Sequence, residues 1–288
     1  MKSSRGPDHR SFCFHAALRF IILGALALLP VPSRLRAEAE APAALPALTL
    51  PARPALPLAH RHSTFVIVHG SWGGGWAFRE VDRLLAADGH RVYRPTLTGQ
   101  GEKVHLASRD IGLATHIEDI VNVILFEDLH DVVLVGHSYG GMVITGVMDR
   151  IPERIRQVIF LDAAVPDDGE SLNLLRHRTP TAAQTASGFV VPEGLKPDAS
   201  LPHDEPQSLK TWTEPVSFKN PLAKKIPGTF VAFLHDGDSV EKRRQTVDWQ
   251  RAEARGWVLL TLDSDHNAQW SHPKELAQLL EEVAGRRP

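Results

Sequence analysis

One serine lies in the surroundings that nucleophilic chemistry by a hydroxyl requires. Residues 132–135 are β-prone and apolar, and they lead directly into the Gly-x-Ser-x-Gly pattern of residues 136–140, with Ser138 at its centre. The apolar stretch 142–148 follows and is typical of a helix. A strand, a tight turn and a helix in this order hold a serine on a strained backbone with its hydroxyl above the sheet edge. The pattern predicts that Ser138 is a nucleophile.

A serine hydroxyl is a weak nucleophile and needs a base, an acid that orients the base, and donors for the oxyanion. In this strand–turn–helix context the chain order is serine, acid, histidine. Residues 256–263 form a predicted late strand that ends in the polar loop 264–267. Because that loop can reach over the sheet edge, we predict that His266 is the base. His272 precedes the predicted helix-opening Pro273 and is expected to lie in solvent.

The acid has three candidates. The β-prone run 229–234 is followed by Asp236 and Asp238. Asp236 is favoured, because it comes as the strand ends and suits a side chain directed at the histidine. Asp238 is an equally natural N-terminal cap for the helix predicted at 240–254. Asp162 closes an earlier strand and is the third candidate.

The oxyanion needs one N–H from the residue after the nucleophile and one from a loop after an early strand. The first is the backbone N–H of Tyr139. The apolar strand 64–68 is followed by the glycine-rich segment 69–76, which can bend towards the serine. The sequence therefore predicts the backbone N–H of Ser71 as the second donor.

Strand and helix patterns alternate along most of the chain. Alternation of this kind predicts an α/β fold with a mostly parallel sheet and helices on both faces. Residues 166–227 interrupt the alternation with nine prolines and few regular patterns, and we expect them to form a cap over the active site. The predicted strands are 64–69, 90–95, 131–136, 157–163, 229–235 and 256–262, and the predicted helices are 76–88, 114–127, 140–150, 240–254 and 273–284.

These residues together resemble the α/β-hydrolase superfamily, and within it the plant-type methylesterase and hydroxynitrile-lyase group with its bacterial relatives. The resemblance is carried by FVIVHGSWGGGW (65–76), GHRV (89–92), VLVGHSYGGM (133–142), IFLDAAVP (159–166) and Asp265–His266. It covers about residues 64–170 and 229–285. It implies a hydrolase that acts on small esters without a cofactor, with Ser138, His266 and the aspartate of the 229–238 segment in the triad positions.

The chain departs from the family pattern at specific positions. Many esterases of the group carry a histidine among the oxyanion-loop glycines, where this chain has Gly73 or Gly74. Relatives that cleave cyanohydrins carry a threonine after the first-strand histidine and a lysine after the catalytic histidine. Here those positions are Gly70 and Asn267, which favours a hydrolase over a lyase. Residues 166–227 do not match, so the resemblance does not imply a particular substrate.

Composition is that of an ordinary globular enzyme. Hydrophobic residues make up 43% and charged residues 23% of the chain, which is enough for one α/β core. The net charge is −2 and no basic run is interleaved with aromatic residues, so we expect no nucleic-acid partner. Neither a phosphate-binding glycine loop nor a Cys/His cluster with metal-ligand spacing occurs in the sequence. We therefore expect a small-molecule ester as the partner, and no cofactor or metal.

The N-terminal segment has the features of a targeting signal. Basic residues precede the apolar run 20–29, and the small residues Ala37 and Ala39 follow it. This pattern predicts a secretory signal peptide and a secreted or periplasmic protein without stable membrane association after processing. A retained anchor is the alternative. Cleavage would also remove Cys13, the only cysteine. The expected division of the chain is 1–39 signal peptide, 40–62 Ala/Pro-rich linker and 63–288 hydrolase domain.

The leading hypothesis is a serine carboxylesterase that hydrolyses small to medium esters or lactones through an acyl-enzyme on Ser138. A lyase with the same triad is one alternative, and a non-catalytic small-molecule binder on the same scaffold is another. A complete triad favours the enzyme, because a binder has no need of the base.

Overall fold

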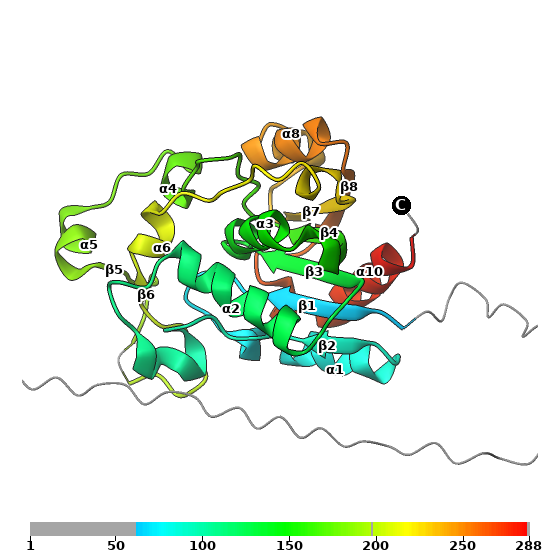
Figure 1. The fold of residues 1–288 in the computed structure, drawn as a ribbon. Helices are drawn as coiled ribbons and strands as arrows, with labels where there is room; N and C mark the ends of the chain where they lie inside the picture. Colours follow the sequence, from blue (N-terminus) through cyan, green and yellow to red (C-terminus); the bar gives the residue numbers. More distant parts are fainter. Residues whose placement is uncertain (1–61, 197, 287–288) are drawn as a thin grey trace, which may run out of the picture. The chain divides into compact units, whose positions relative to one another are not determined.

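The computed structural model describes residues 62–196 and 198–286. Its main feature is a six-stranded sheet in the order β2-β1-β3-β4-β7-β8 (Figure 1), in which every neighbouring pair is parallel. The mostly parallel α/β fold predicted from the alternating pattern is confirmed. The strands are β1 (Thr64–Val68), β2 (Arg91–Tyr93), β3 (Val132–His137), β4 (Ile155–Leu161), β7 (Gly228–Leu234) and β8 (Val258–Asp263).

Helices cover both faces of this sheet because alternate strand residues point to opposite sides. Phe65 and Ile67 of β1 pack in one apolar cluster with helices α1 and α10. Val66 and Val68 pack in a second cluster with helices α2, α3 and α8. The helices are α1 (Arg79–Ala87), α2 (Leu113–Phe126), α3 (Gly140–Arg150), α7 (Val240–Arg244), α8 (Val247–Ala254), α9 (Ala268–Ser271) and α10 (Pro273–Gly285), with 3₁₀ turns at Gly75–Phe78, Gly101–Leu106, Pro152–Arg154 and Ala223–Lys225.

The helix predicted at 240–254 is two helices. Ser239 caps α7, because its side chain accepts a hydrogen bond from the Lys242 N–H. Thr246 caps α8 in the same way, from the Trp249 N–H. The second cap residue within the predicted span restarts the helix at a new angle, which a continuous apolar pattern cannot indicate.

A cap between β4 and β7 lies at one side of the sheet, where Figure 1 shows α4, α5 and α6 together. The Trp72 N–H donates to Gln207 Oε1 at 3.0 Å, and the Trp72 ring N–H donates to the Val190 carbonyl at 3.0 Å. These bonds join the cap to the loop after β1. The elements of the cap are α4 (Leu172–Leu175), α5 (Ala182–Ser187), β5 (Phe189–Val190), β6 (Gln207–Ser208) and α6 (Lys210–Thr213). Strand β5 pairs antiparallel with β6.

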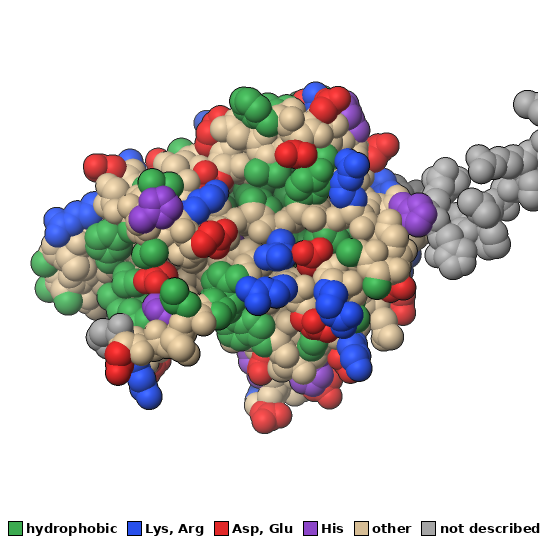
Figure 2. Space-filling view, turned by 90° about the horizontal axis from the view of Figure 1, so that it is seen from below, with side chains coloured by type: hydrophobic (Ala, Val, Ile, Leu, Met, Phe, Trp, Pro, Cys, Tyr) green, Lys and Arg blue, Asp and Glu red, His purple; other side chains and the backbone are tan. Residues whose placement is uncertain are grey.

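The expected signal peptide, the linker up to residue 61 and Cys13 lie outside the described residues. Within the described ranges, no helix combines the length and the apolar character needed to cross a membrane. On the face shown in Figure 2, basic and acidic side chains are interspersed, so that face presents no extended field of one sign.

Candidate active site

Ser138 occupies the turn between β3 and α3 in a left-handed backbone conformation with φ of 54°. A residue with a side chain adopts this conformation only at a cost that its surroundings must offset. Glycines on both sides make the tight turn possible. A Cβ at Gly136 would lie 2.9 Å from the Gly140 carbonyl oxygen, and a Cβ at Gly140 would lie 2.6 Å from the Val68 carbonyl oxygen of β1. Larger residues at either position would force the turn away from the sheet.

A continuous chain of hydrogen bonds runs from Ser138 through His266 to a carboxylate. The Ser138 Oγ lies 2.9 Å from Nε2 of His266, and Nδ1 of the same ring lies 2.6 Å from Oδ2 of Asp162. Asp162 follows β4 and is 5% exposed, whereas His266 lies in the loop after β8. The structure therefore brings Ser138 and His266 together and places the Asp162 carboxylate beside them.

Asp236, the favoured acid, is not the carboxylate that His266 contacts. Residues 235–238 form a tight turn, in which the Asp238 N–H donates to the His235 carbonyl at 2.8 Å and Gly237 has a φ of 79°. Asp236 lies at the tip of this turn and is exposed. Asp238 neither contacts His266 nor caps α7; its carboxylate lies 3.9 Å from the Arg243 guanidinium. In the structure, His266 is therefore paired with Asp162 and not with Asp236.

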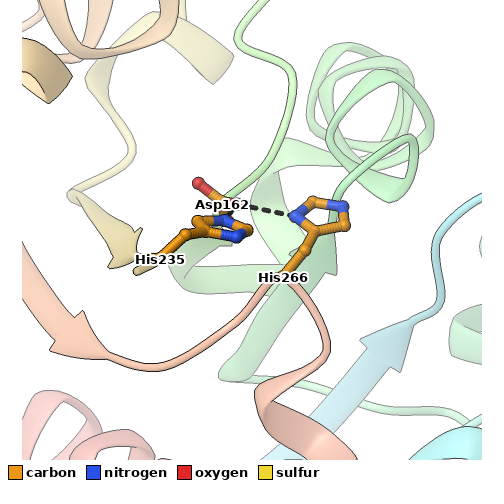
Figure 3. Close-up of side chains that lie close together, drawn as sticks. All are labelled: Asp162, His235 and His266. Carbon is orange, nitrogen blue, oxygen red and sulfur yellow. Dashed lines mark hydrogen bonds and ion pairs between the residues drawn. The ribbon is translucent and has the colours of Figure 1, made fainter. Parts of the chain in front are cut away.

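Asp162 has two further partners besides His266. Figure 3 shows the rings of His235 and His266 close to the Asp162 side chain, with a dashed line from Asp162 to His266. His235 Nε2 lies 3.3 Å from Oδ2, and the Arg243 guanidinium of α7 donates to Oδ1. The side chain of Asp162 is therefore held by three groups: His266, His235 and Arg243.

Asp162, His235 and His266 form a group that could hold a metal ion, judged by the positions of their ligand atoms in the described residues. Ligand atoms of Asp162, His235 and His266 lie within 4.8 Å of one another. A cation at this point would face the fixed positive charge of Arg243, which already pairs with Asp162. It would also take Nδ1 of His266 away from the carboxylate. The donor set therefore fits hydrogen bonding better than metal coordination.

His266 is neutral around pH 7. Burial lowers the pKa of His266 most strongly, and the neighbouring His235 and Arg243 act in the same direction, so that this pKa falls from 6.5 to about 4. A neutral imidazole whose Nδ1–H donates to Asp162 presents a free electron pair on Nε2 to the serine hydroxyl. The arrangement can therefore accept the proton of Ser138.

His137, at the end of β3 beside Ser138, both packs against its neighbours and makes a hydrogen bond to the loop after β8. Its ring is buried and stacks on Phe233 with centroids 6.3 Å apart. Burial lowers the pKa of His137 to about 3, so the ring is neutral, and its Nε2–H donates to the His266 carbonyl at 2.7 Å. This bond ties the histidine loop to the strand that carries the nucleophile. His272, expected in solvent, instead contacts the Ser264 hydroxyl at 3.1 Å through Nδ1.

The loop after β1 approaches the serine closely. A Cβ at Gly70 would lie 3.0 Å from the Cβ of Ser138, so a side chain at Gly70 would press on the nucleophile. Within the described ranges, neither the Ser71 N–H nor the Tyr139 N–H donates to a protein acceptor. Both predicted donors are therefore available to a ligand oxygen.

The ring of Tyr139 anchors the start of α3 behind the serine. It is 2% exposed, and its hydroxyl lies 2.9 Å from Nδ1 of His116. The Nε2–H of His116 donates to the Thr98 carbonyl at 3.0 Å, so Nδ1 is the acceptor for the tyrosine hydroxyl. His116 joins Tyr139 to the loop after β2 and holds the residue after the nucleophile in place.

Ser138 and His266 open into a cavity of about 140 Å³. Aromatic rings line it: Trp72 and Phe78 come from the segment after β1, and Trp270 comes from α9. Trp270 is held by stacking on Trp76 at 5.5 Å between ring centroids. The small volume suits a small reacting group.

Sequence reasoning did not find His235, Arg243 or the cap residue Asp204, which also lines this cavity. Histidine, arginine and aspartate are common in loops and helices, and none of these three belongs to a spaced motif. Only the three-dimensional arrangement brings them to the site.

Comparison with known proteins agrees with this geometry. The model of the alpha/beta hydrolase family matches residues 65–279. The chain belongs to the α/β-hydrolase family. A carbendazim-hydrolysing esterase of Nocardioides is 36% identical over 242 residues, which cover 76% of this chain and 98% of that protein. Methylesterase 10 of Arabidopsis thaliana is 32% identical over 263 residues, which cover 77% and 92% of the two chains.

A solved structure of an α/β-hydrolase is also similar to this chain. The extracellular α/β-hydrolase from a Paenibacillus species, described as homologous in structure and function to tobacco salicylic acid-binding protein 2, superimposes with a TM-score of 0.62 at 25% identity. The match covers 78% of this chain and 99% of that one. The resemblance to methylesterases and their bacterial relatives is confirmed, and the chain is an esterase-like α/β-hydrolase.

Proposed function

We propose that this α/β-hydrolase is a serine carboxylesterase that cleaves small to medium esters or lactones through an acyl-enzyme on Ser138. The observation that carries the proposal is the hydrogen-bonded chain from Ser138 through His266 to Asp162 at the end of a cavity. The names of the relatives support ester hydrolysis, because one is an esterase and others are methylesterases.

In the first half of the reaction, Nε2 of His266 accepts the Ser138 proton while Oγ attacks the ester carbonyl carbon. The imidazolium that forms is stabilised by Asp162, towards which Nδ1–H already points. The carbonyl oxygen gains negative charge and accepts hydrogen bonds from the N–H groups of Ser71 and Tyr139. The intermediate then expels the alkoxy group, which leaves as the alcohol with the proton from His266.

Water completes the cycle by the same route. His266 accepts a proton from water while its oxygen attacks the acyl carbon of the acyl-enzyme. Collapse of the second intermediate returns the proton to Ser138 and releases the carboxylic acid. No other chemical group is required, and the cavity of about 140 Å³ favours small acyl or alkoxy groups.

Covalent labelling tests this proposal directly. A fluorophosphonate should modify the wild-type protein at one site and should not modify Ser138→Ala, whose esterase activity should fall by about 10⁴-fold or more. Ser217→Ala is the matched control, because Ser217 is an exposed cap serine bonded to Asp149 and away from the cavity. A folded Ser138→Ala variant with near-normal ester turnover would overturn the proposal.

The site lacks the positive charge that a cyanohydrin lyase requires beside its catalytic histidine. Departing cyanide needs a fixed positive charge beside the catalytic histidine, and this chain has the neutral Asn267 there, in the wall of the cavity. We therefore expect a higher kcat/KM for methyl and p-nitrophenyl esters than for mandelonitrile. A higher kcat/KM for mandelonitrile would favour the lyase. A non-catalytic binder would turn over neither the esters nor mandelonitrile, and its Ser138→Ala variant would keep its ligand affinity.

We also propose that the protein is exported, on the basis of the N-terminal pattern of residues 1–39. N-terminal sequencing of the native protein should find a species that begins near Glu40. An intact Met1 on a cytosolic protein would overturn this proposal.

A further inference from the structure

One carboxylate in the catalytic cavity has no part in the proposed reaction. Asp204 belongs to the cap and lines the same cavity as Ser138 and His266. It is partly buried, and no side-chain or backbone donor bonds to its carboxylate in the residues that the structure describes. A carboxylate that has lost water without gaining a donor is costly, and such a group in a binding cavity is a natural partner for a ligand.

The cap holds Asp204 firmly against the loop that carries Ser71. On the chain beside it, the Glu205 N–H donates to the Trp72 carbonyl at 2.8 Å, and Gln207 Oε1 accepts from the Trp72 N–H at 3.0 Å. Asp204 itself lies against this loop: a Cβ at Gly73 would be 3.9 Å from its Oδ1. These bonds hold the segment that carries Asp204 against the loop after β1, beside the cavity.

Among the described residues, no side chain forms an ion pair with the Asp204 carboxylate. His203 is directed elsewhere, because its Nδ1 lies 2.9 Å from the Asp204 backbone oxygen and 3.6 Å from the Glu205 carboxylate. Burial raises the pKa of Asp204; the nearby His203 opposes this rise, and the negative charge of Glu205 adds to it. A donor or a cation supplied by a ligand would relieve both effects.

Aromatic rings complete the environment of a cation site. Trp72, Phe78 and Trp270 line the same cavity as Asp204. Aromatic faces attract cations, and a carboxylate forms its strongest hydrogen bonds with charged N–H donors. We propose that Asp204 determines specificity by selecting esters whose acyl or alkoxy part carries a nitrogen donor, either an ammonium group or a polarised N–H. This inference rests on the proposed esterase function and names its substrate class.

Paired esters of equal shape test the inference. Methyl glycinate and methyl propanoate differ in an ammonium and a methyl group, and methyl β-alaninate and methyl butanoate extend the same pair by one carbon. The ratio of kcat/KM within each pair is measured at about pH 6.5, below the pKa of an α-amino group. Dividing by the ratio for hydroxide-catalysed hydrolysis removes the difference in chemical reactivity.

The wild-type protein should prefer the ammonium ester of at least one pair after this correction. Asp204→Asn should lower that preference by about tenfold or more, the value of one charge-assisted hydrogen bond. Glu193→Gln is the matched control, because Glu193 is an exposed acidic residue of the cap and does not line this cavity. Its preference should remain that of the wild type.

The outcomes separate this inference from the esterase proposal. Hydrolysis of both members of each pair with no corrected preference, or a preference that Asp204→Asn leaves unchanged, overturns the role of Asp204 and leaves the esterase standing. If the wild type hydrolyses no ester, the esterase proposal fails instead. Calorimetric titration of the Ser138→Ala protein with methyl glycinate and methyl propanoate then decides the ligand preference by itself, with tighter binding of the ammonium ester expected.

Discussion

Nδ1 of His266 lies 2.6 Å from Oδ2 of Asp162, although their strands, β8 and β4, are separated in the sheet by β7. The histidine loop crosses above the end of β7 to reach the edge next to β3. The bond from His137 to the His266 carbonyl fixes the far end of that crossing. The carboxylate that contacts His266 therefore follows β4, the strand next to β3, and the loop after β7 contributes His235 as an additional partner of Asp162.

The first prediction concerns this acid. Asp162→Asn should lower kcat for ester hydrolysis by about 10⁴-fold, because an amide favours the wrong tautomer of His266. Asp236→Asn should change kcat less than about threefold, since the Asp236 side chain is exposed at the tip of a turn. Steady-state kinetics on the two variants, each with its fold checked by circular dichroism, make the comparison. The opposite ranking would return the acid to Asp236.

Much of the fold and part of the site could be predicted because the signals are local. The glycines beside Ser138 and the apolar runs before and after it belong to one continuous segment, and the parallel sheet follows from the alternation of such segments. His266 could be found because chain order restricts the base to the last strand. In each case, neighbouring residues in the sequence carry the information.

The acid could not be settled in this way. Asp162, Asp236 and Asp238 all follow β-prone strands, and the choice depends on which strand lies next to β3 and on how each loop turns. The left-handed Gly237 turns Asp236 outwards, whereas Asp162, with a φ of 43°, turns into the site. The position of Asp204 could not be predicted from the sequence, because the cap has no periodic pattern that would place this residue over the cavity.

The second prediction concerns the bond that His137 makes to the histidine loop. His137→Phe keeps the ring packing on Phe233 but removes the donor to the His266 carbonyl. We expect kcat to fall by about tenfold to 100-fold with little change in KM, because a small displacement of the base acts on the chemical step. His137→Gln, which can still donate from its amide, should recover part of the loss. Equal kcat for the wild type and His137→Phe would show that the bond does not position the base.

The third prediction is the pH dependence of the reaction. Only neutral His266 can accept the serine proton, and its pKa is about 4, so kcat/KM should fall on the acid side near pH 4 rather than near pH 6.5. Arg243→Gln removes a positive charge beside the ring and leaves Asp162 less neutralised. Both effects stabilise the imidazolium, so the acid limb should move to higher pH by about one unit.

Arg244→Gln is the control for this shift, because Arg244 is the next residue on α7 and its side chain is exposed. Its pH profile should match that of the wild type. An acid limb near pH 6.5 in the wild type would show that the surroundings do not lower the pKa of His266.

The last prediction links buried histidines to stability in acid. His116 is fully buried and neutral, with Nδ1 accepting from Tyr139 and Nε2–H donating to Thr98, and burial lowers its pKa from 6.5 to about 4. Between these two pH values the unfolded chain binds a proton that the folded chain does not. The free energy of unfolding therefore decreases as the pH falls below 6.5, by about 1.4 kcal/mol per pH unit for each such histidine.

Urea unfolding at pH 7 and pH 5 measures this effect. His116→Gln removes the titrating group, so its loss of unfolding free energy between the two pH values should be smaller than that of the wild type by about 2 kcal/mol. His69 and His137 are also buried with lowered pKa values and remain in the variant, so part of the acid sensitivity should persist. An identical pH dependence in both proteins would mean that His116 titrates alike in the folded and unfolded chains. That result would contradict the buried, neutral ring behind Tyr139.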